Sequence, residues 1–182
     1  MSKQAVVVVD LQNEYLPTGK LALVGVEQAV ANAARIIGAA RNHGDLVVHI
    51  RHEFVTPGVP FFVPGTEGVE IIEAVAPKDG EPVILKNYPN SFLKTDLQKV
   101  LADNGIQKLT VIGAMSHMCI DATTRAASDL GYEVTVVDDA CATRDLEFRD
   151  QVVPAAQVHA TLMSALGFAY ATILTTQEYL RK

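Results

Sequence analysis

Cys119 is the residue of this sequence with the clearest potential for chemistry, because of where it stands along the chain. It follows an apolar, β-branched run at residues 109–112 and a Gly-Ala-Met-Ser-His-Met loop, and it opens a stretch of small residues at helical spacing. The first N–H groups of a helix lack partners and the helix dipole is positive there, so a thiolate is favoured over a thiol. Cys119 is therefore a candidate nucleophile. A small buried residue at a helix start is the simpler interpretation.

An acidic and a basic side chain stand in comparable places elsewhere. Asp10 ends the apolar run of residues 5–9, and Lys86 ends the run of residues 82–85. Short apolar runs are typical of strands covered on both faces of a parallel sheet, so each charge is predicted at the carboxyl end of a strand. Alone, Asp10 could cap a turn and Lys86 could be only its ion-pair partner. Beside a cysteine, they could act as a base and a stabilising cation.

The elements that must position these residues alternate between strands and helices. Residues 52–68, rich in Pro, Gly and Phe, predict a long loop, and residues 144–150 predict a charged connection. Thr95, with Gln98 three residues on, predicts a helix cap. The predicted strands are residues 5–9, 46–51, 82–85, 109–112, 134–137 and 169–174, and the predicted helices are residues 26–41, 95–105, 119–130, 154–166 and 176–180.

This alternation predicts an α/β fold in three layers, α/β/α, around a six-stranded parallel sheet. In the common strand order 3-2-1-4-5-6, strands one and four are neighbours at the switch point, beyond whose carboxyl ends ligands bind. That order would put Asp10 beside Cys119, with Lys86 close enough to reach the same crevice. Since no repeat or linker interrupts the chain, residues 1–182 are predicted to form a single domain.

The composition argues against several kinds of partner. The net charge of −6, without a cluster of Lys and Arg, indicates binding to neither nucleic acid nor an anionic membrane. The apolar run before Asp10 is too short for a signal peptide or a membrane span, so a cytoplasmic location is expected. Cys119 and Cys141 have no C-x-x-C spacing and are predicted to be reduced thiols. The absence of a G-x-G-x-x-G or P-loop motif weakens the alternative of a nucleotide-binding or regulatory module.

Three segments resemble, in this order, the isochorismatase-like superfamily of cysteine hydrolases, which includes nicotinamidase and N-carbamoylsarcosine amidase. They are VVVVDLQNEY around Asp10, VILKNYPNSF around Lys86, and IGAMSHMCIDATTRAASDLGYEVTVVDDACAT around Cys119. The resemblance runs over residues 6–174 and implies that Asp10, Lys86 and Cys119 form a catalytic triad. It also implies a non-proline cis peptide bond between Ala114 and Met115, and an oxyanion hole built from the N–H groups of Met115 and Cys119.

The activity implied is hydrolysis of a small amide, carbamoyl or similar C–N bond through a thioester on Cys119, with release of ammonia or an amine. The alternative within the family is a true isochorismatase, which cleaves a vinyl ether. Those enzymes lack the nucleophilic cysteine, so Cys119 favours amide chemistry. His117, two residues from Cys119, is a further candidate base, although the family uses the aspartate.

The metal site of nicotinamidases, an Asp-x-His with a further His, is where this chain departs from the pattern. His52 stands at the aspartate position and Phe54 at the histidine position, so neither a metal nor another cofactor is expected, and nicotinamide is disfavoured as the substrate. His49 and His52 are three residues apart on an extended segment, so they are predicted to point to opposite faces.

Several residues near the predicted mouth of the crevice are candidate contacts for a small, partly apolar substrate, although each could instead be core or subunit contact. They are Gln12, Tyr15, Phe54, Phe61, Phe62, Tyr88 and Met118. Members of the family usually form symmetric assemblies, so the resemblance also implies a homo-oligomer, a dimer or tetramer.

Overall fold

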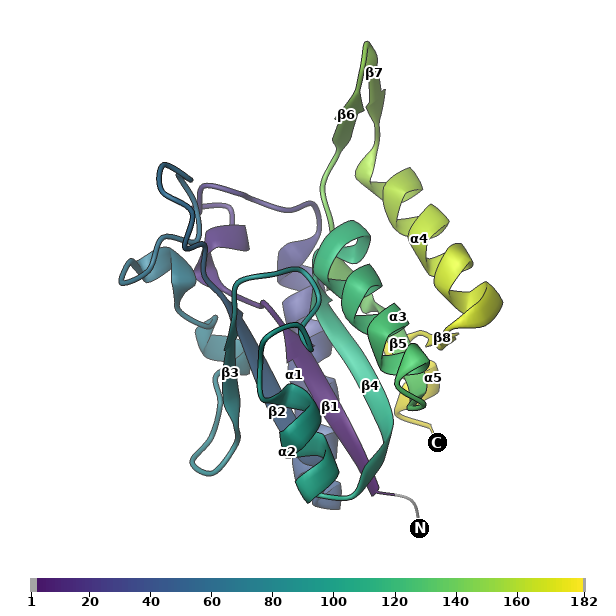
Figure 1. Cartoon of the computed structure of the whole chain (residues 1–182). Helices are drawn as coiled ribbons and strands as arrows, with labels where there is room; N and C mark the ends of the chain where they lie inside the picture. The colour runs from purple at the N-terminus through teal and green to yellow at the C-terminus, as the bar shows by residue number, and fades with distance from the viewer. Residues whose placement is uncertain (1–2, 182) are drawn as a thin grey trace.

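The computed structural model describes residues 3–181 and contains a parallel six-stranded sheet between two layers of helices (Figure 1). The order of the strands is β3-β2-β1-β4-β5-β8, which confirms the predicted order and the α/β/α architecture. The strands are β1 (Lys3–Val9), β2 (Leu46–His52), β3 (Val83–Lys86), β4 (Ile106–Ala114), β5 (Glu133–Ala142) and β8 (Thr172–Leu174).

The two faces of the sheet form two separate cores. In β1, Val6 and Val8 pack into the core under α1 (Val26–His43), whereas Val7 and Val9 pack into the opposite core. This alternation follows from the two-residue period of a strand, and it explains why β1 is apolar at every position from residue 5 to residue 9. Helices α2 (Leu97–Asp103), α3 (Asp121–Asp129) and α4 (Ala155–Ala169) cover the second face, and the short α5 (Thr176–Tyr179) lies with α1 on the first.

Several element boundaries differ from the sequence predictions. The N-cap of α2 is Asp96, not Thr95, although the Thr95 hydroxyl accepts a hydrogen bond from the Leu97 N–H at 3.3 Å. The sixth strand of the sheet is shorter than predicted, because α4 continues to Ala169. Residues 53–66 carry no helix or strand, which confirms the long loop after β2, and three short 3₁₀ helices lie at Asn13–Tyr15, Glu67–Val69 and Glu73–Val75.

A β-hairpin replaces the predicted charged connection after β5. Its strands are β6 (Leu146–Phe148) and β7 (Gln151–Val153), joined through Arg149 and Asp150. Figure 1 shows this hairpin as an arm that stands out from the body above α4, and Phe148 on it is 66% exposed. Three-residue strands are too short to give a periodic sequence pattern, so the hairpin was not predicted.

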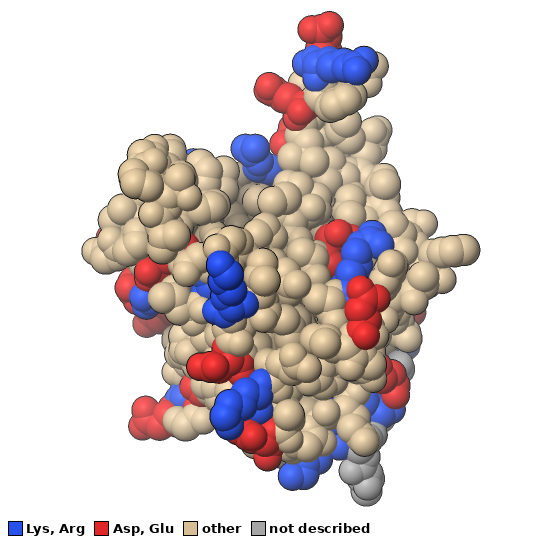
Figure 2. Space-filling model, viewed as in Figure 1, with Lys and Arg blue, Asp and Glu red and all other residues tan. Residues whose placement is uncertain are grey.

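The surface is uneven in charge and in shape. Figure 2 shows Lys, Arg, Asp and Glu scattered over the lower part of one face and at the tip of the arm. The same view shows a hollow between the base of the arm and a lobe formed by the loops that follow β2. Within residues 3–181, no helix combines the length and the apolar character that crossing a membrane requires.

Candidate active site

The carboxyl ends of three strands bring the predicted acid, base and sulfur together. Asp10 directly follows β1, Lys86 is the last residue of β3, and Cys119 follows β4. The Lys86 Nζ lies 2.7 Å from Asp10 Oδ2 and 3.2 Å from Cys119 Sγ. Asp10, Lys86 and Cys119 are 0%, 1% and 6% exposed, so only the sulfur residue reaches the surface appreciably. The cluster can therefore combine a nucleophile, a base and a fixed positive charge out of water.

A sharp change of backbone direction presents Asp10 to this cluster. Asp10 has a φ of 53°, in the left-handed region that aspartate tolerates better than most residues. Its N–H still donates to the Ile50 carbonyl of β2 at 3.0 Å, so the residue stays attached to the sheet. Across from it in β4, Gly113 has a φ of 127°, and a Cβ there would meet the Val9 carbonyl oxygen at 2.0 Å. The two strand ends can approach each other only because Gly113 has no side chain.

The loop that carries Cys119 is a single turn of π-helix, Ser116–Ile120, ahead of α3. The Met115 carbonyl accepts hydrogen bonds from the N–H groups of Met118 and Ile120, at 3.0 and 3.2 Å. The Ala114–Met115 peptide bond at its start is cis. Ser116, fully buried, bonds the His159 Nδ1 of α4 at 2.8 Å through its hydroxyl. The turn is thus held at its start and from the side.

Burial, more than the helix end, controls the acidity of the cluster. Burial raises the pKa of the Cys119 thiol and the Asp10 charge raises it further, against the opposing effect of Lys86. Burial and the Asp10 charge therefore act against the thiolate that the helix start was predicted to favour. Burial also raises the pKa of Asp10, with Lys86 opposing. Burial alone would lower the pKa of Lys86, but the charges of Asp10 and Cys119 outweigh it and raise the pKa. The resting site thus holds a thiol and an ammonium ion.

His52 is part of the cluster, and the sequence did not indicate this. Its Nδ1 lies 2.9 Å from Lys86 Nζ. The two residues are direct partners in the register of β2 against β3. His49, three residues earlier, bonds Glu81 at 3.0 Å instead, so the two histidines do not converge. Among the residues that the structure describes, no three His, Cys, Asp or Glu side chains are grouped as a metal site would require. The residues present at this position do not fit the metal site of nicotinamidases.

His117, the alternative base, is turned toward another partner. Its Nδ1 lies 2.6 Å from the Thr143 hydroxyl, at the end of β5. Arg144 follows Thr143, is exposed, and is near enough that its charge, after burial, lowers the pKa of His117. Arg144 was not predicted as a site residue, because it stood in a segment interpreted only as a charged connection. Its exposed guanidinium is close enough for its charge to act on both His117 and Tyr15.

The predicted substrate contacts differ in how accessible their side chains are to a ligand. The amide of Gln12 bonds backbone atoms only, with Nε2 donating to the carbonyls of His52 and Val69 and Oε1 accepting from the His52 N–H. Gln12 therefore fixes the end of β2 and has no free group for a ligand. Phe62 is 1% exposed and packs edge-on against Tyr15 at 5.0 Å, so Phe62 belongs to the core.

Tyr15 is also buried, yet it lies near the triad. Burial raises the pKa of its hydroxyl, and the charges of Cys119 and Asp10 raise it further. Phe54 and Phe61 are partly buried and in edge contact at 5.6 Å in the loop after β2. Tyr88 and Met118 are 39% and 41% exposed, so they remain available to a ligand.

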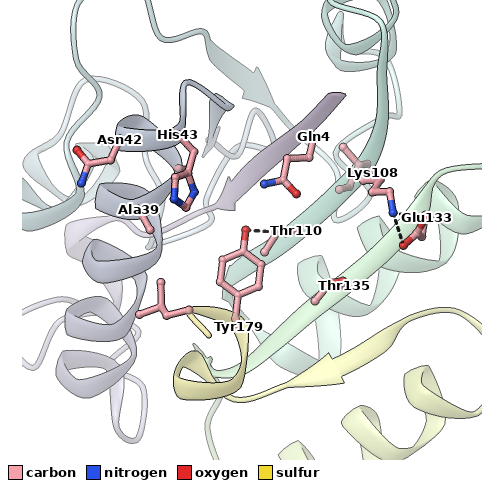
Figure 3. A pocket seen from close by; sticks show the side chains of 12 residues that line it. Gln4, Ala39, Asn42, His43, Lys108, Thr110, Glu133, Thr135 and Tyr179 are labelled. Carbon is pink, nitrogen blue, oxygen red and sulfur yellow. Dashed lines mark hydrogen bonds and ion pairs between the residues drawn. The ribbon is translucent and has the colours of Figure 1, made fainter. Parts of the chain in front are cut away.

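A second concavity lies at the opposite, amino ends of the strands. This groove of about 490 Å³ is bounded by the starts of β1, β4 and β5, the end of α1, and α5. Figure 3 shows two pairings among its polar side chains: the Thr110 hydroxyl donates to Tyr179, and Lys108 meets Glu133. Neither cysteine lines the groove. The acid, lysine and sulfur cluster lies instead at the carboxyl ends of the strands.

Comparison with known proteins gives one consistent family. The isochorismatase domain matches residues 4–166. An uncharacterized isochorismatase family protein of Bacillus subtilis, YddQ, is 49% identical over 179 residues, which are 97% of this chain and 98% of that protein. A solved structure described as an isochorismatase hydrolase of Oleispira antarctica has a TM-score of 0.95 at 51% identity, over 100% of this chain and 97% of that one. N-carbamoylsarcosine amidase of Thermoplasma acidophilum has a TM-score of 0.81 at 28% identity, over 96% of both chains.

Proposed function

The chain belongs to the isochorismatase family, and from that premise we propose that it hydrolyses a small amide or related C–N bond through a thioester on Cys119. The observation that carries the proposal is the position of Lys86 Nζ, 2.7 Å from a carboxylate oxygen of Asp10 and 3.2 Å from the Cys119 sulfur. A base within reach of a thiol and a neighbouring positive charge both favour formation of the nucleophilic thiolate. Similarity to N-carbamoylsarcosine amidase supports C–N hydrolysis in particular.

In the first half of the proposed reaction, the Cys119 sulfur attacks the carbonyl carbon while its proton passes to Asp10. The electron pair of the C=O bond moves to the oxygen, which the N–H groups of Met115 and Cys119 hold as an oxyanion. When the oxyanion collapses, the C–N bond breaks and the leaving nitrogen takes the proton from Asp10. The acyl group remains on the sulfur as a thioester.

In the second half, Asp10 takes a proton from a water molecule that attacks the thioester carbonyl. The C–S bond breaks, the acid is released, and the proton returns to the sulfur. Lys86 keeps its charge throughout and stabilises whichever partner, Asp10 or the sulfur, carries the negative charge. The raised pKa of Cys119 supports this sequence, because a resting thiol needs a base at the moment of attack. Asp10 Oδ2 lies 2.7 Å from Lys86 Nζ, whereas Oδ1 has no hydrogen-bond partner among residues 3–181, so Oδ1 can accept the proton.

We further propose that the substrate carries an anionic group. Arg144 is exposed, next in sequence to the residue that bonds His117, and its charge opposes the rise in the pKa of Tyr15. A guanidinium in this position suits a carboxylate, to which it can donate two hydrogen bonds at once. The name N-carbamoylsarcosine also describes a carboxylate-bearing substrate. Arg144→Met is expected to raise KM for anionic amides and to leave neutral amides unaffected.

The proposal is tested by measuring ammonia release from small primary amides, carbamoyl compounds and ureido acids, each offered to the native protein and to two cysteine variants. Cys119→Ala removes the proposed nucleophile. Cys141→Ala is the matched control, because Cys141 is also buried but its thiol accepts only the Gly113 backbone hydrogen bond. We expect hydrolysis by the native protein and by Cys141→Ala, and none by Cys119→Ala.

Three outcomes contradict the proposal. Ammonia release that survives Cys119→Ala excludes a thioester on Cys119. Failure of the native protein to release ammonia, together with cleavage of a vinyl ether that persists in Cys119→Ala, favours the chemistry of true isochorismatases. Binding of small molecules without turnover of any amide favours a non-catalytic module on the same fold. The homo-oligomer, dimer or tetramer, stays a prediction from the resemblance, and light scattering on the purified chain tests it.

A further inference from the structure

Lys86 has a third partner that the proposed reaction does not use. An ammonium group has three N–H donors and no acceptor. In this structure Lys86 Nζ lies within hydrogen-bond distance of three atoms: Asp10 Oδ2 at 2.7 Å, Cys119 Sγ at 3.2 Å and His52 Nδ1 at 2.9 Å. The first two partners belong to the triad, and the third is a neutral ring.

We propose that His52 is a positioning residue of the triad, whose Nδ1 lone pair takes the third N–H of Lys86 and so aims the other two at Asp10 and Cys119. The inference rests on the proposed function in one respect, that Cys119 is the nucleophile. Lys86 is 1% exposed, so water cannot readily replace a missing acceptor. A buried ammonium hydrogen without a partner is costly, and the side chain would turn away to satisfy it.

The sheet itself sets this contact. His52 and Lys86 are register partners on the parallel strands β2 and β3, so their side chains leave the sheet side by side. The Lys86 carbonyl accepts the Glu53 N–H at 3.1 Å, which fixes the two strand ends together. The contact therefore comes from the most rigid part of the site.

The ring of His52 has little freedom to move. Its backbone N–H and carbonyl are both held by the Gln12 amide, at 2.8 and 2.9 Å. Its ring is in edge contact with Phe54 at 4.6 Å and with Phe62 at 5.4 Å. Gln12 and Phe62 thus contribute to the site indirectly, because they fix the position of His52, which contacts Lys86.

The arrangement fixes the tautomer of His52. Because Lys86 can only donate, Nδ1 must be the acceptor and Nε2 must carry the proton. With three partners already within hydrogen-bond distance of Nζ, Lys86 is poorly placed to bind a substrate carbonyl as well. The oxyanion must therefore be held by other donors, which agrees with backbone N–H groups in that role.

The test compares variants by the rate at which iodoacetamide alkylates Cys119 at pH 8, followed by peptide mass spectrometry. His52→Asn places an amide oxygen where Nδ1 lies, whereas His52→Gln places its amide one carbon farther out. Lys86 favours the thiolate of Cys119, so a displaced Lys86 leaves less thiolate. We expect His52→Gln to alkylate about three- to tenfold more slowly than the native protein. That factor corresponds to part of the free energy of a hydrogen bond to a charged group. We expect His52→Asn to alkylate at nearly the native rate.

Three further measurements separate positioning from mere stability. His49→Gln, which changes a buried histidine of the same strand that bonds Glu81, is expected to leave the alkylation rate unchanged. With an amide found in the substrate screen, His52→Gln is expected to lower kcat and leave KM unaltered. Nitrogen-15 NMR of the native protein is expected to report a bare Nδ1 and a protonated Nε2 on His52, without any variant having to fold.

Equal alkylation rates in folded His52→Asn and His52→Gln overturn the inference, and so does a protonated Nδ1 in the native protein. Neither alkylation nor NMR needs a substrate. If the expected pattern appears but no amide is hydrolysed, His52 positions Lys86 and the proposed function is wrong. If amide hydrolysis depends on Cys119 but the pattern is absent, the function stands and the inference falls.

Discussion

The two ends of the sheet each hold a lysine paired with a carboxylate, and the two pairs behave very differently. At the amino ends, Lys108 of β4 meets Glu133 of β5 at 2.8 Å, with side chains 41% and 68% exposed. At the carboxyl ends, Lys86 meets Asp10 at 2.7 Å, with both side chains fully buried. The distances are nearly equal. Environment, rather than geometry, therefore makes one pair a surface feature and the other a candidate for catalysis.

Water explains the difference. Around Lys108 and Glu133 the solvent screens the charges, so the pair contributes little to stability. Around Lys86 and Asp10 no bulk water competes, so their charges act on the nearest polarisable group, the Cys119 sulfur. A lysine–carboxylate pair is thus inert at one end and able to act on a thiol at the other.

The largest expected effect separates the two carboxylates by activity. Asp10→Asn keeps the shape of the side chain but removes the base, so kcat for the amide found by the screen is expected to fall about 10²–10⁴-fold. Glu133→Gln at the other end is expected to leave kcat unchanged. Steady-state ammonia release by the two purified variants makes the comparison. An Asp10→Asn variant that keeps native turnover would remove Asp10 from the reaction.

The second effect separates the two lysines by stability. Lys86→Met leaves the Asp10 carboxylate buried without a counter-charge and is expected to cost about 3–5 kcal/mol of unfolding free energy. Lys108→Met removes the partner of Glu133, whose carboxylate stays hydrated, and is expected to cost less than about 1 kcal/mol of unfolding free energy. Urea unfolding followed by circular dichroism measures both. The double variant Asp10→Asn/Lys86→Met should regain part of the loss, and a further loss would contradict this explanation.

A smaller effect separates two glycines, one at each end. Gly113→Ala places a Cβ 2.0 Å from the Val9 carbonyl oxygen at a φ of 127°, and is expected to cost about 2–4 kcal/mol. Gly44, which ends α1 before β2, has a φ of 75° with open space around it, so Gly44→Ala is expected to cost about 1 kcal/mol. Thermal unfolding ranks the two variants. Equal losses would show that the close approach of β1 and β4 is not rigid.

The smallest effect is a difference in acid sensitivity. Burial, with the Lys86 charge, lowers the pKa of His52 from 6.5 to about 3. Between these two pH values, His52 binds a proton in the unfolded chain but not in the folded chain. Stability is therefore expected to fall as the pH drops from 6.5 toward 3. At the start of β3, burial alone would raise the pKa of Glu81, but hydrogen bonds led by that from Arg41 lower it from 4.5 to about 2. Its contribution is present above pH 4.5 and is lost as the pH falls through 2.

Unfolding measured at several pH values tests this difference. His52→Asn is expected to flatten the decline of stability already between pH 6.5 and 4.5, where the other buried histidines supply the remaining slope. Glu81→Gln is expected to flatten it only below pH 4.5. A reversed order of the two windows would contradict the assignment of these groups.

The carboxyl ends of the strands could be predicted from sequence because the pattern there is local. The apolar run before Asp10 and the one before Lys86 each identify a strand and its last residue, and the parallel strand order then brings the two charges to one edge. The position of Cys119 after β4 follows in the same way. These three placements needed no knowledge of side-chain packing.

What could not be predicted depends on contacts between distant segments. The pairing of His52 with Lys86 follows from the register of β2 against β3, which no short stretch of sequence specifies. The acidity of the Cys119 thiol was predicted from the helix start, which the sequence shows. The burial that raises the pKa of this thiol cannot be read from the sequence. Gln12 was predicted to contact substrate, but its side-chain amide forms hydrogen bonds with the backbone N–H and carbonyl of His52.

The near-complete enclosure of Cys119 also has a consequence for its chemical durability. Peroxides attack thiolates that solvent can reach, and the first product, a sulfenic acid, can progress to irreversible oxides. At 6% exposure, with its proton retained until a base removes it, this sulfur presents little of the form that an oxidant attacks. The proposed nucleophile is thereby shielded from small oxidants while it carries its proton, and it is expected to outlast an exposed cysteine under aerobic conditions.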